Sequence, residues 1–167
     1  MLSVRNISVR LALVMGSLMY AAGSAEAATA TTTFTVQITI LANCAIDSAS
    51  TLNFGSQGIL SANVDATSTI QVTCTNTTPY NIGLSVGTGA GATVTTRKMT
   101  SGGSTIDYSL YRDVGRTQLW GTTIGTDTVA ATGSGAAQPH TVYGRVPPQG
   151  TPAPATYSDT ITVTVTY

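Results

Sequence analysis

Apolar and polar side chains alternate along the stretch FTVQITI, residues 34–40. Alternation with a period of two puts the apolar side chains on one face of an extended chain, which is typical of a half-buried β-strand. Residues 29–42 contain no glycine or proline, and an extended run from Phe34 to Ile40 spans roughly 23 Å. At the other end of the chain, TITVTVTY at residues 160–167 alternates in the same way and ends on the apolar Tyr167.

The segments between these two runs continue the strand pattern. Similar alternation occurs at residues 70–74, 82–86, 106–110 and 142–146, with weaker apolar runs at 52–54, 93–99 and 118–120. Turn-forming clusters separate them at 76–79, 87–91, 101–103 and 133–135. We expect exposed loops at 129–138, which is rich in glycine and alanine, and at 147–155, which is rich in proline. Many short strands without a helical period predict an all-β, antiparallel sandwich or barrel.

The composition agrees with this fold class and excludes several functions. The chain has 167 residues, of which only 8% are charged and 42% are hydrophobic. Threonine is the most frequent residue, and threonine and valine favour strands. Seven basic and seven acidic residues give a net charge of zero, which argues against binding nucleic acid through phosphate neutralisation.

The first 27 residues have the pattern of a secretory signal peptide. Arg5 and Arg10 precede an apolar stretch at residues 11–23, and Ala25-Glu26-Ala27 forms a cleavage site of the small-x-small type. The apolar stretch is shorter than the about 20 residues that a membrane span needs, although an uncleaved anchor is the alternative. We expect an exported protein without stable membrane insertion after cleavage, and one domain in residues 28–167.

Cys44 and Cys74 are the only cysteines. An even number of cysteines in an exported chain indicates a disulfide, and two free buried thiols are the alternative. A bridge over this span contributes roughly 3.5 kcal/mol in the loop-entropy model.

The sequence offers little material for catalysis. His140, the only histidine, is expected in a loop and lacks the acid and nucleophile that a general base needs. One histidine and two cysteines cannot supply the three or four ligands of a zinc site, and the aspartates lack calcium-loop spacing. Arg97 and Lys98 are expected on a solvated strand edge, and Trp120 is expected in the core or a groove. We therefore expect no enzyme, no cofactor and no metal.

The two terminal runs leave two arrangements open. An immunoglobulin-like sandwich needs about seven strands, and no strand follows Tyr167. A sandwich without its last strand exposes an apolar groove and an unpaired edge, which invite a strand from another chain. Residues 34–40 have the shape of such a donor. From the pattern alone, however, we favour these residues as the first strand of a self-contained sandwich.

Eight short segments, in order, carry a resemblance to a known family. The sequence resembles the spore coat protein U domain family over residues 30–167, and that family includes pilin subunits of archaic (Csu-type) chaperone–usher pili. The segments, after a beginning at residues 34–44, are LNFG (52–55), VTC (72–74), RKM (97–99), YSLYRD (108–113), LWG (119–121), YGRVP (143–147), YSDT (157–160) and VTVTY (163–167).

The resemblance implies an incomplete immunoglobulin-like, pilin-like β-sandwich that a donor strand from another subunit completes. It divides the chain into a signal peptide (1–27), a donor-strand extension (28–43) and a sandwich domain (44–167). It implies a Cys44–Cys74 disulfide. The residues assigned to the donor strand are Phe34, Val36, Ile38 and Ile40, and those assigned to the C-terminal strand that borders the groove and meets the chaperone are Ile161, Val163, Val165 and Tyr167.

The implied function is that of a structural subunit of a secreted fibre or coat that polymerises by donor-strand exchange, with a role in adhesion and biofilm formation. The implied partners are identical or related pilin subunits, a periplasmic chaperone and an outer-membrane usher. The implied location is the periplasm during export, and then an extracellular fibre or the cell surface. The alternative is a monomeric secreted β-sandwich that binds carbohydrate or a surface ligand.

Overall fold

The computed structural model describes residues 26–167, which contain β-strands and no helix. Within this range no helix is therefore long and apolar enough to cross a membrane. The predicted signal peptide lies almost entirely outside the described residues. The eight strands are β1 (Cys44–Ala49), β2 (Val64–Cys74), β3 (Pro79–Leu84), β4 (Arg97–Ser101), β5 (Ser104–Tyr111), β6 (Val129–Thr132), β7 (Ala137–Val146) and β8 (Val163–Thr166).

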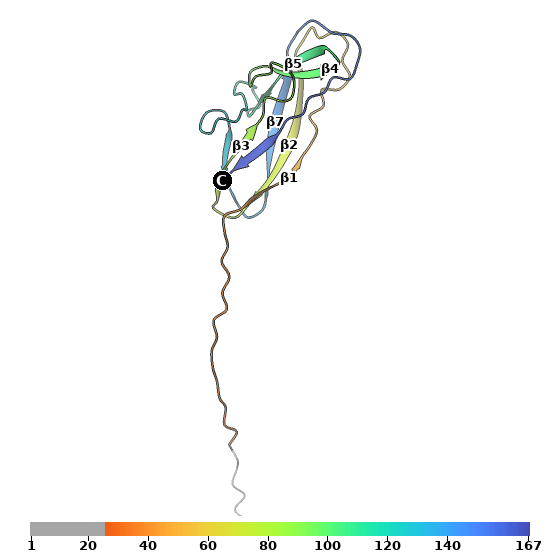
Figure 1. Cartoon of the computed structure of the whole chain (residues 1–167). Helices are drawn as coiled ribbons and strands as arrows, with labels where there is room; N and C mark the ends of the chain where they lie inside the picture. Colours follow the sequence, from red (N-terminus) through yellow and green to blue (C-terminus); the bar gives the residue numbers. More distant parts are fainter. Residues whose placement is uncertain (1–25) are drawn as a thin grey trace, which may run out of the picture. The chain divides into compact units, whose positions relative to one another are not determined.

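The strands form two sheets that pack as a sandwich (Figure 1). The order is β1-β2-β7-β5-β4 in the larger sheet and β6-β3-β8 in the smaller one, and all paired strands are antiparallel. The longest pairing joins β2 to β7, from Val64 opposite Val146 to Thr73 opposite Ala137. The predicted all-β sandwich is confirmed.

The core lies between the sheets and follows the alternation seen in the sequence. Ile70, Val72 and Cys74 of β2 are buried while their neighbours are more exposed, and Ile82 and Leu84 of β3 face them. Trp120 is 1% exposed, and its indole Nε1 donates a hydrogen bond of 2.8 Å to the carbonyl of Ile82. The expectation that Trp120 packs in the core is confirmed.

Two strands lie where the sequence predicted none. β1 is an edge strand, and five of its six side chains are exposed, so it carries no alternating pattern. The loop predicted at residues 129–138 is wrong, because Val129–Thr132 forms β6 and the last residues of the range begin β7. The loop expected at residues 147–155 contains no strand, as predicted. The weak apolar run at residues 52–54 also forms no strand.

The predicted disulfide is present between Cys44 and Cys74. The two residues lie opposite each other in the pairing of β1 with β2. The bridge therefore fastens the first residue of the edge strand β1 to the last residue of β2.

The chain divides into two units, the first ending at Ile38 and the second running from Thr39 to Tyr167. Residues 26–43 belong to no strand. The side chains of Phe34, Val36, Ile38 and Ile40 are between 71% and 85% exposed. The pattern-based preference for residues 34–40 as the first strand of a self-contained sandwich is therefore not met. Period two marks a segment able to form a strand, but the pattern does not say which edge the segment pairs with.

Candidate strand-acceptor groove

A groove lies between the two sheets, beside the last residue of β1 (Ala49) and the first residue of β8 (Val163). Its first part has a volume of about 440 Å³. Its walls are residues 49–54, which begin at the end of β1, and residues 157–161 together with Val163, the first residue of β8. Its floor consists of core side chains from both sheets, namely Ile70, Leu84, Tyr108, Leu110 and Val142. The groove thus reaches down to the core along this side, although these floor side chains are only 1–4% exposed.

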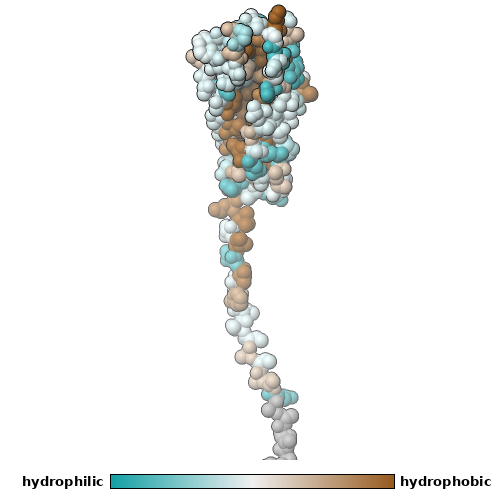
Figure 2. All heavy atoms as spheres, turned by 90° about the vertical axis from the view of Figure 1, so that its right-hand side faces the viewer, coloured by the Kyte–Doolittle hydropathy of each residue, from teal (hydrophilic) through white to brown (hydrophobic). Residues whose placement is uncertain are grey.

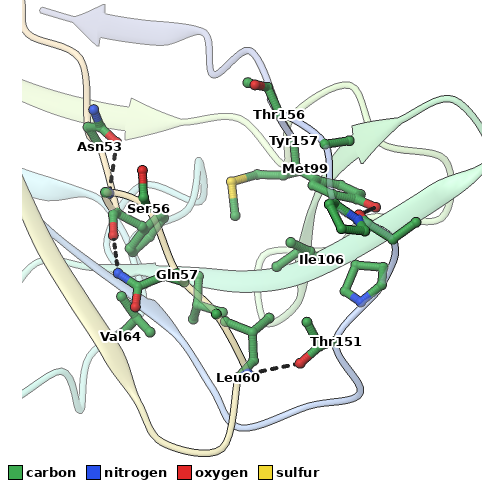
Figure 3. Close-up of a pocket in the computed structure, with 18 of the residues that line it drawn as sticks. Asn53, Ser56, Gln57, Leu60, Val64, Met99, Ile106, Thr151, Thr156 and Tyr157 are labelled. Carbon is green, nitrogen blue, oxygen red and sulfur yellow. Dashed lines mark hydrogen bonds between the residues drawn. The ribbon is translucent and has the colours of Figure 1, made fainter.

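The groove continues into a second part with a volume of about 600 Å³ (Figure 3). Residues 52–58 and 151–157 form its walls, and Leu60, Val64, Met99, Ile106 and Val146 add apolar surface. The two parts share Leu52, Asn53, Phe54, Met99 and Tyr157, so they form one continuous depression. Figure 2 shows hydrophobic residues along a strip of the domain surface.

The groove is bordered by an edge strand that has one hydrogen-bonded neighbour. β8 pairs with β3 through four residue pairs, from Asn81 opposite Thr166 to Leu84 opposite Val163, and it is the last strand of its sheet. Along β8 the valines are half-buried and the threonines exposed. An edge of this kind is a template for one more strand.

The wall formed by residues 52–54 depends on a glycine of β7. A Cβ at Gly144 would lie 2.8 Å from both methyl carbons of Leu52 and 2.9 Å from Cζ of Phe54. The missing side chain therefore lets these two residues reach into the sandwich. The Phe54 ring also meets Tyr108 edge to face, with the ring centroids 6.2 Å apart. Leu52 and Phe54 are groove residues that the sequence did not identify, because they lie in a segment without a regular period.

Hydrogen bonds to Asp159 fix the opposite wall of the groove, the segment that leads into β8. Oδ2 of Asp159 accepts a 2.7 Å hydrogen bond from the hydroxyl of Tyr108, and its Oδ1 accepts bonds from the backbone N and the hydroxyl of Thr88 at 2.7 and 2.9 Å. Desolvation by burial raises the pKa of Asp159, but the hydrogen bonds together outweigh it, so the pKa is lowered from its ordinary value. Burial, together with the bond to Asp159, raises the pKa of Tyr108. The segment that leads into β8 is therefore tied to the larger sheet.

A second tie lies one residue earlier. Ser158 and Thr100 of β4 exchange two backbone hydrogen bonds, of 2.8 and 3.1 Å. The chain thus pairs with the larger sheet at Ser158 and with the smaller sheet from Val163. It crosses between the sheets along the groove.

Arg97, expected on a solvated strand edge, is fully buried. Its guanidinium donates hydrogen bonds to four backbone carbonyls, those of Ser85, Val94, Leu84 and Trp120, at distances from 2.6 to 3.3 Å. Burial lowers its pKa. The expectation was wrong because three separate segments, at residues 84–85, 94 and 120, supply the carbonyls, and no local pattern shows that they come together. Lys98, by contrast, is partly exposed and pairs with Asp107 at 2.8 Å.

The predicted groove strand is only partly in the groove lining. Ile161 and Val163 line it, and Val165 packs against the core. Tyr167 is 56% exposed, and its hydroxyl donates a 3.3 Å bond to Oδ1 of Asn43. Whether these residues meet a chaperone stays a prediction.

His140 lies in β7, not in the predicted loop, and its Nε2 is 2.9 Å from the hydroxyl of Tyr80. Burial lowers the pKa of the imidazole. The imidazole and the Tyr80 ring meet edge to face, so the residue has a packing role. In residues 26–167 no three histidine, cysteine, aspartate or glutamate side chains gather in an arrangement that could hold a metal ion.

Comparison with known proteins gives consistent matches. The sequence profile of the Spore Coat Protein U domain matches residues 30–164. Protein U of Myxococcus xanthus is 34% identical over 171 residues, which cover 93% of this chain and 95% of that protein. Among solved structures, the fold is similar to a chain of the CsuC–CsuE chaperone–tip adhesion subunit pre-assembly complex from the archaic chaperone–usher Csu pili of Acinetobacter baumannii. That match has a TM-score of 0.58 and 22% identity, and it covers 77% of this chain and 41% of the other.

Proposed function

The chain belongs to the Spore Coat Protein U domain family, and from this we propose that it is a structural subunit of a secreted surface fibre or coat. In this proposal the subunits polymerise by donor-strand exchange. Residues 34–40 of one subunit lie in the groove of the next, along the free edge of β8.

The observation that carries the proposal is that one chain holds both a groove beside the edge strand β8 and a segment, residues 34–40, whose alternating apolar side chains are exposed. The floor of the groove consists of apolar core side chains, and four apolar side chains of the extension are between 71% and 85% exposed. Burying four such side chains contributes roughly 6–12 kcal/mol as an upper estimate. This is comparable with the about 5–15 kcal/mol of net stability of a whole domain. The free energy gained when a donor strand fills the groove is thus large enough to decide whether the subunit is stable.

The donor and the strand beside the groove also match in length and period. The proposed donor side chains are Phe34, Val36, Ile38 and Ile40, and the proposed strand beside them carries Ile161, Val163, Val165 and Tyr167. Each set holds apolar residues at every second position. A strand added along β8 adds backbone hydrogen bonds, and the alternate side chains fill the groove.

The proposal includes the division of the chain into a signal peptide (1–27), a donor-strand extension (28–43) and a sandwich domain (44–167). It places the subunit in the periplasm during export and on the cell surface afterwards. We propose other pilin subunits, a periplasmic chaperone and an outer-membrane usher as partners, and a contribution to adhesion and biofilm formation. The similarity to a chain from a chaperone–pilus subunit complex supports the chaperone and the subunits. We propose a structural role and no catalytic one.

A deletion of residues 29–40 tests the proposal. The shortened subunit should accept a donor strand but offer none. Added to the full mature chain, it should shorten the polymers that electron microscopy and light scattering detect, because each copy ends a fibre. Polymers made by the shortened subunit alone would contradict donor-strand exchange. A mature chain that remains a stable monomer would favour the alternative, a secreted binding module.

A further inference from the structure

Met99 is the one methionine in residues 28–167, and it lies in the groove. It belongs to β4, opposite Ile106 of β5, and it lines both parts of the groove. Figure 3 shows its side chain extending from β4 into the second part of the groove, with the sulfur toward the open space. The residue is half-buried and packs against the edge of the core.

We propose that Met99 is an oxidation site that is open when the groove is empty and closed when a donor strand fills it. The co-reactant is a two-electron oxidant such as hydrogen peroxide. A lone pair of the thioether sulfur attacks one peroxide oxygen, an S–O bond forms and the O–O bond breaks. The sulfur is oxidised to the sulfoxide, and the peroxide is reduced to water.

Oxidation changes the chemistry of the groove without changing its shape much. The thioether is apolar and adaptable, whereas the sulfoxide carries a strongly polar oxygen. The lining that Met99 shares includes the apolar side chains of Leu52, Phe54 and Ile106, together with polar ones such as Ser56 and Gln57. A donor strand inserted over the sulfoxide would bury its oxygen away from water, which is unfavourable. Oxidised subunits are therefore expected to bind a donor strand weakly.

The domain offers few competing sites for the oxidant. Cys44 and Cys74 are joined in a disulfide, and Trp120 is 1% exposed. Met99 is thus the reactive side chain whose accessibility depends on the groove. The inference rests on the proposed donor-strand exchange and adds a chemical condition to it: subunits in a fibre are protected, and unfilled subunits are inactivated.

The experiment uses the mature chain with Phe34→Asp and Ile38→Asp, so that its own extension cannot donate. The probe is a fluorescent peptide of residues 29–42, whose binding is measured by fluorescence polarisation before and after treatment with hydrogen peroxide. Mass spectrometry locates the added oxygen. We expect oxidation at Met99 to lower the affinity about tenfold or more, where tenfold corresponds to ~1.4 kcal/mol. Prior addition of the unlabelled peptide should slow the oxidation.

Met99→Leu is the matched control, because leucine has a similar volume and no oxidisable sulfur. The affinity of this variant for the peptide, whatever its starting value, should be the same before and after peroxide. Methionine sulfoxide reductase should restore binding to the oxidised protein that retains Met99. Equal affinity of the reduced and oxidised proteins, or equal loss in Met99→Leu, would overturn the inference while donor-strand binding stands. Failure of the reduced protein to bind the peptide at all would overturn the proposed function and this inference with it.

Discussion

Replacing the buried Arg97 by methionine should destabilise the domain strongly. Methionine has a similar length but no donor, so Arg97→Met removes the hydrogen bonds to the carbonyls of Ser85, Val94, Leu84 and Trp120. Each bond contributes about 1 kcal/mol or more net, and removal of the buried charge offsets a part of the loss. We expect the free energy of unfolding to fall by about 3–5 kcal/mol.

The neighbouring Lys98→Met provides the control for this change. Lys98 pairs with Asp107 at 2.8 Å, but both side chains are partly exposed, at 24% and 40%. Surface pairs contribute about 0–1 kcal/mol, so the control should change stability by no more than that. Both variants lose one positive charge, but only Arg97→Met loses a buried network of hydrogen bonds.

The assay is urea unfolding followed by the fluorescence of Trp120, the only tryptophan, which is buried. Each protein is measured with a saturating peptide of residues 29–42, which stabilises all of them by mass action. A loss below about 1 kcal/mol in Arg97→Met, or equal losses in both variants, would refute the account of Arg97.

Three further predictions concern the groove walls and the disulfide. The pKa of Asp159 is lowered from its ordinary value of 3.8, so its carboxylate stabilises the fold above that pH, and this contribution is lost as the pH falls through the lower folded pKa. The urea midpoint should therefore fall less steeply with decreasing pH in Asp159→Asn than in the unchanged protein, and equal slopes would contradict this. Gly144→Ala should push the wall at residues 52–54 outward, which lowers the free energy of unfolding by about 1–3 kcal/mol and weakens peptide binding. Gly150→Ala, whose new Cβ meets no atom within 4 Å, should change neither quantity, and equal effects of the two substitutions would show that the close approach at Gly144 is unimportant. Replacing Cys44 and Cys74 by serine should lower the unfolding free energy by roughly 3.5 kcal/mol in the same urea assay, and an unchanged midpoint would mean that the bridge does not restrain the unfolded chain.

The sequence predicts the fold wherever one face of a strand is buried. β2 and β8 alternate because their inner residues pack between the sheets, and the alternation is visible in the sequence. β1 escapes prediction because nearly all its side chains are exposed, and β6 because it is short and rich in alanine. β1 forms by pairing with β2, and β6 forms by pairing with β3. Pairing with a distant segment cannot be predicted from a local sequence pattern.

The candidate site is predicted in part for the same reason. Ile161 and Val163 of the groove wall follow from the alternation near the C-terminus. Leu52 and Phe54 do not, because their inward position depends on the space that Gly144 leaves in another strand. The burial of Arg97 likewise depends on carbonyls from separate segments. Such features arise only when the chain has folded.

The oligomeric state of the mature chain is the most direct test of polymerisation by donor-strand exchange. Size-exclusion chromatography with light scattering compares residues 28–167 with a variant carrying Phe34→Asp and Ile38→Asp. The matched control carries Thr35→Asp and Thr39→Asp, which place the same charges on the opposite face of the extension. If the subunits exchange donor strands, the unchanged chain forms polymers, the first variant forms none, and the control largely retains them. A stable monomer of the unchanged chain, or polymers that survive both charges at residues 34 and 38, would contradict donor-strand exchange.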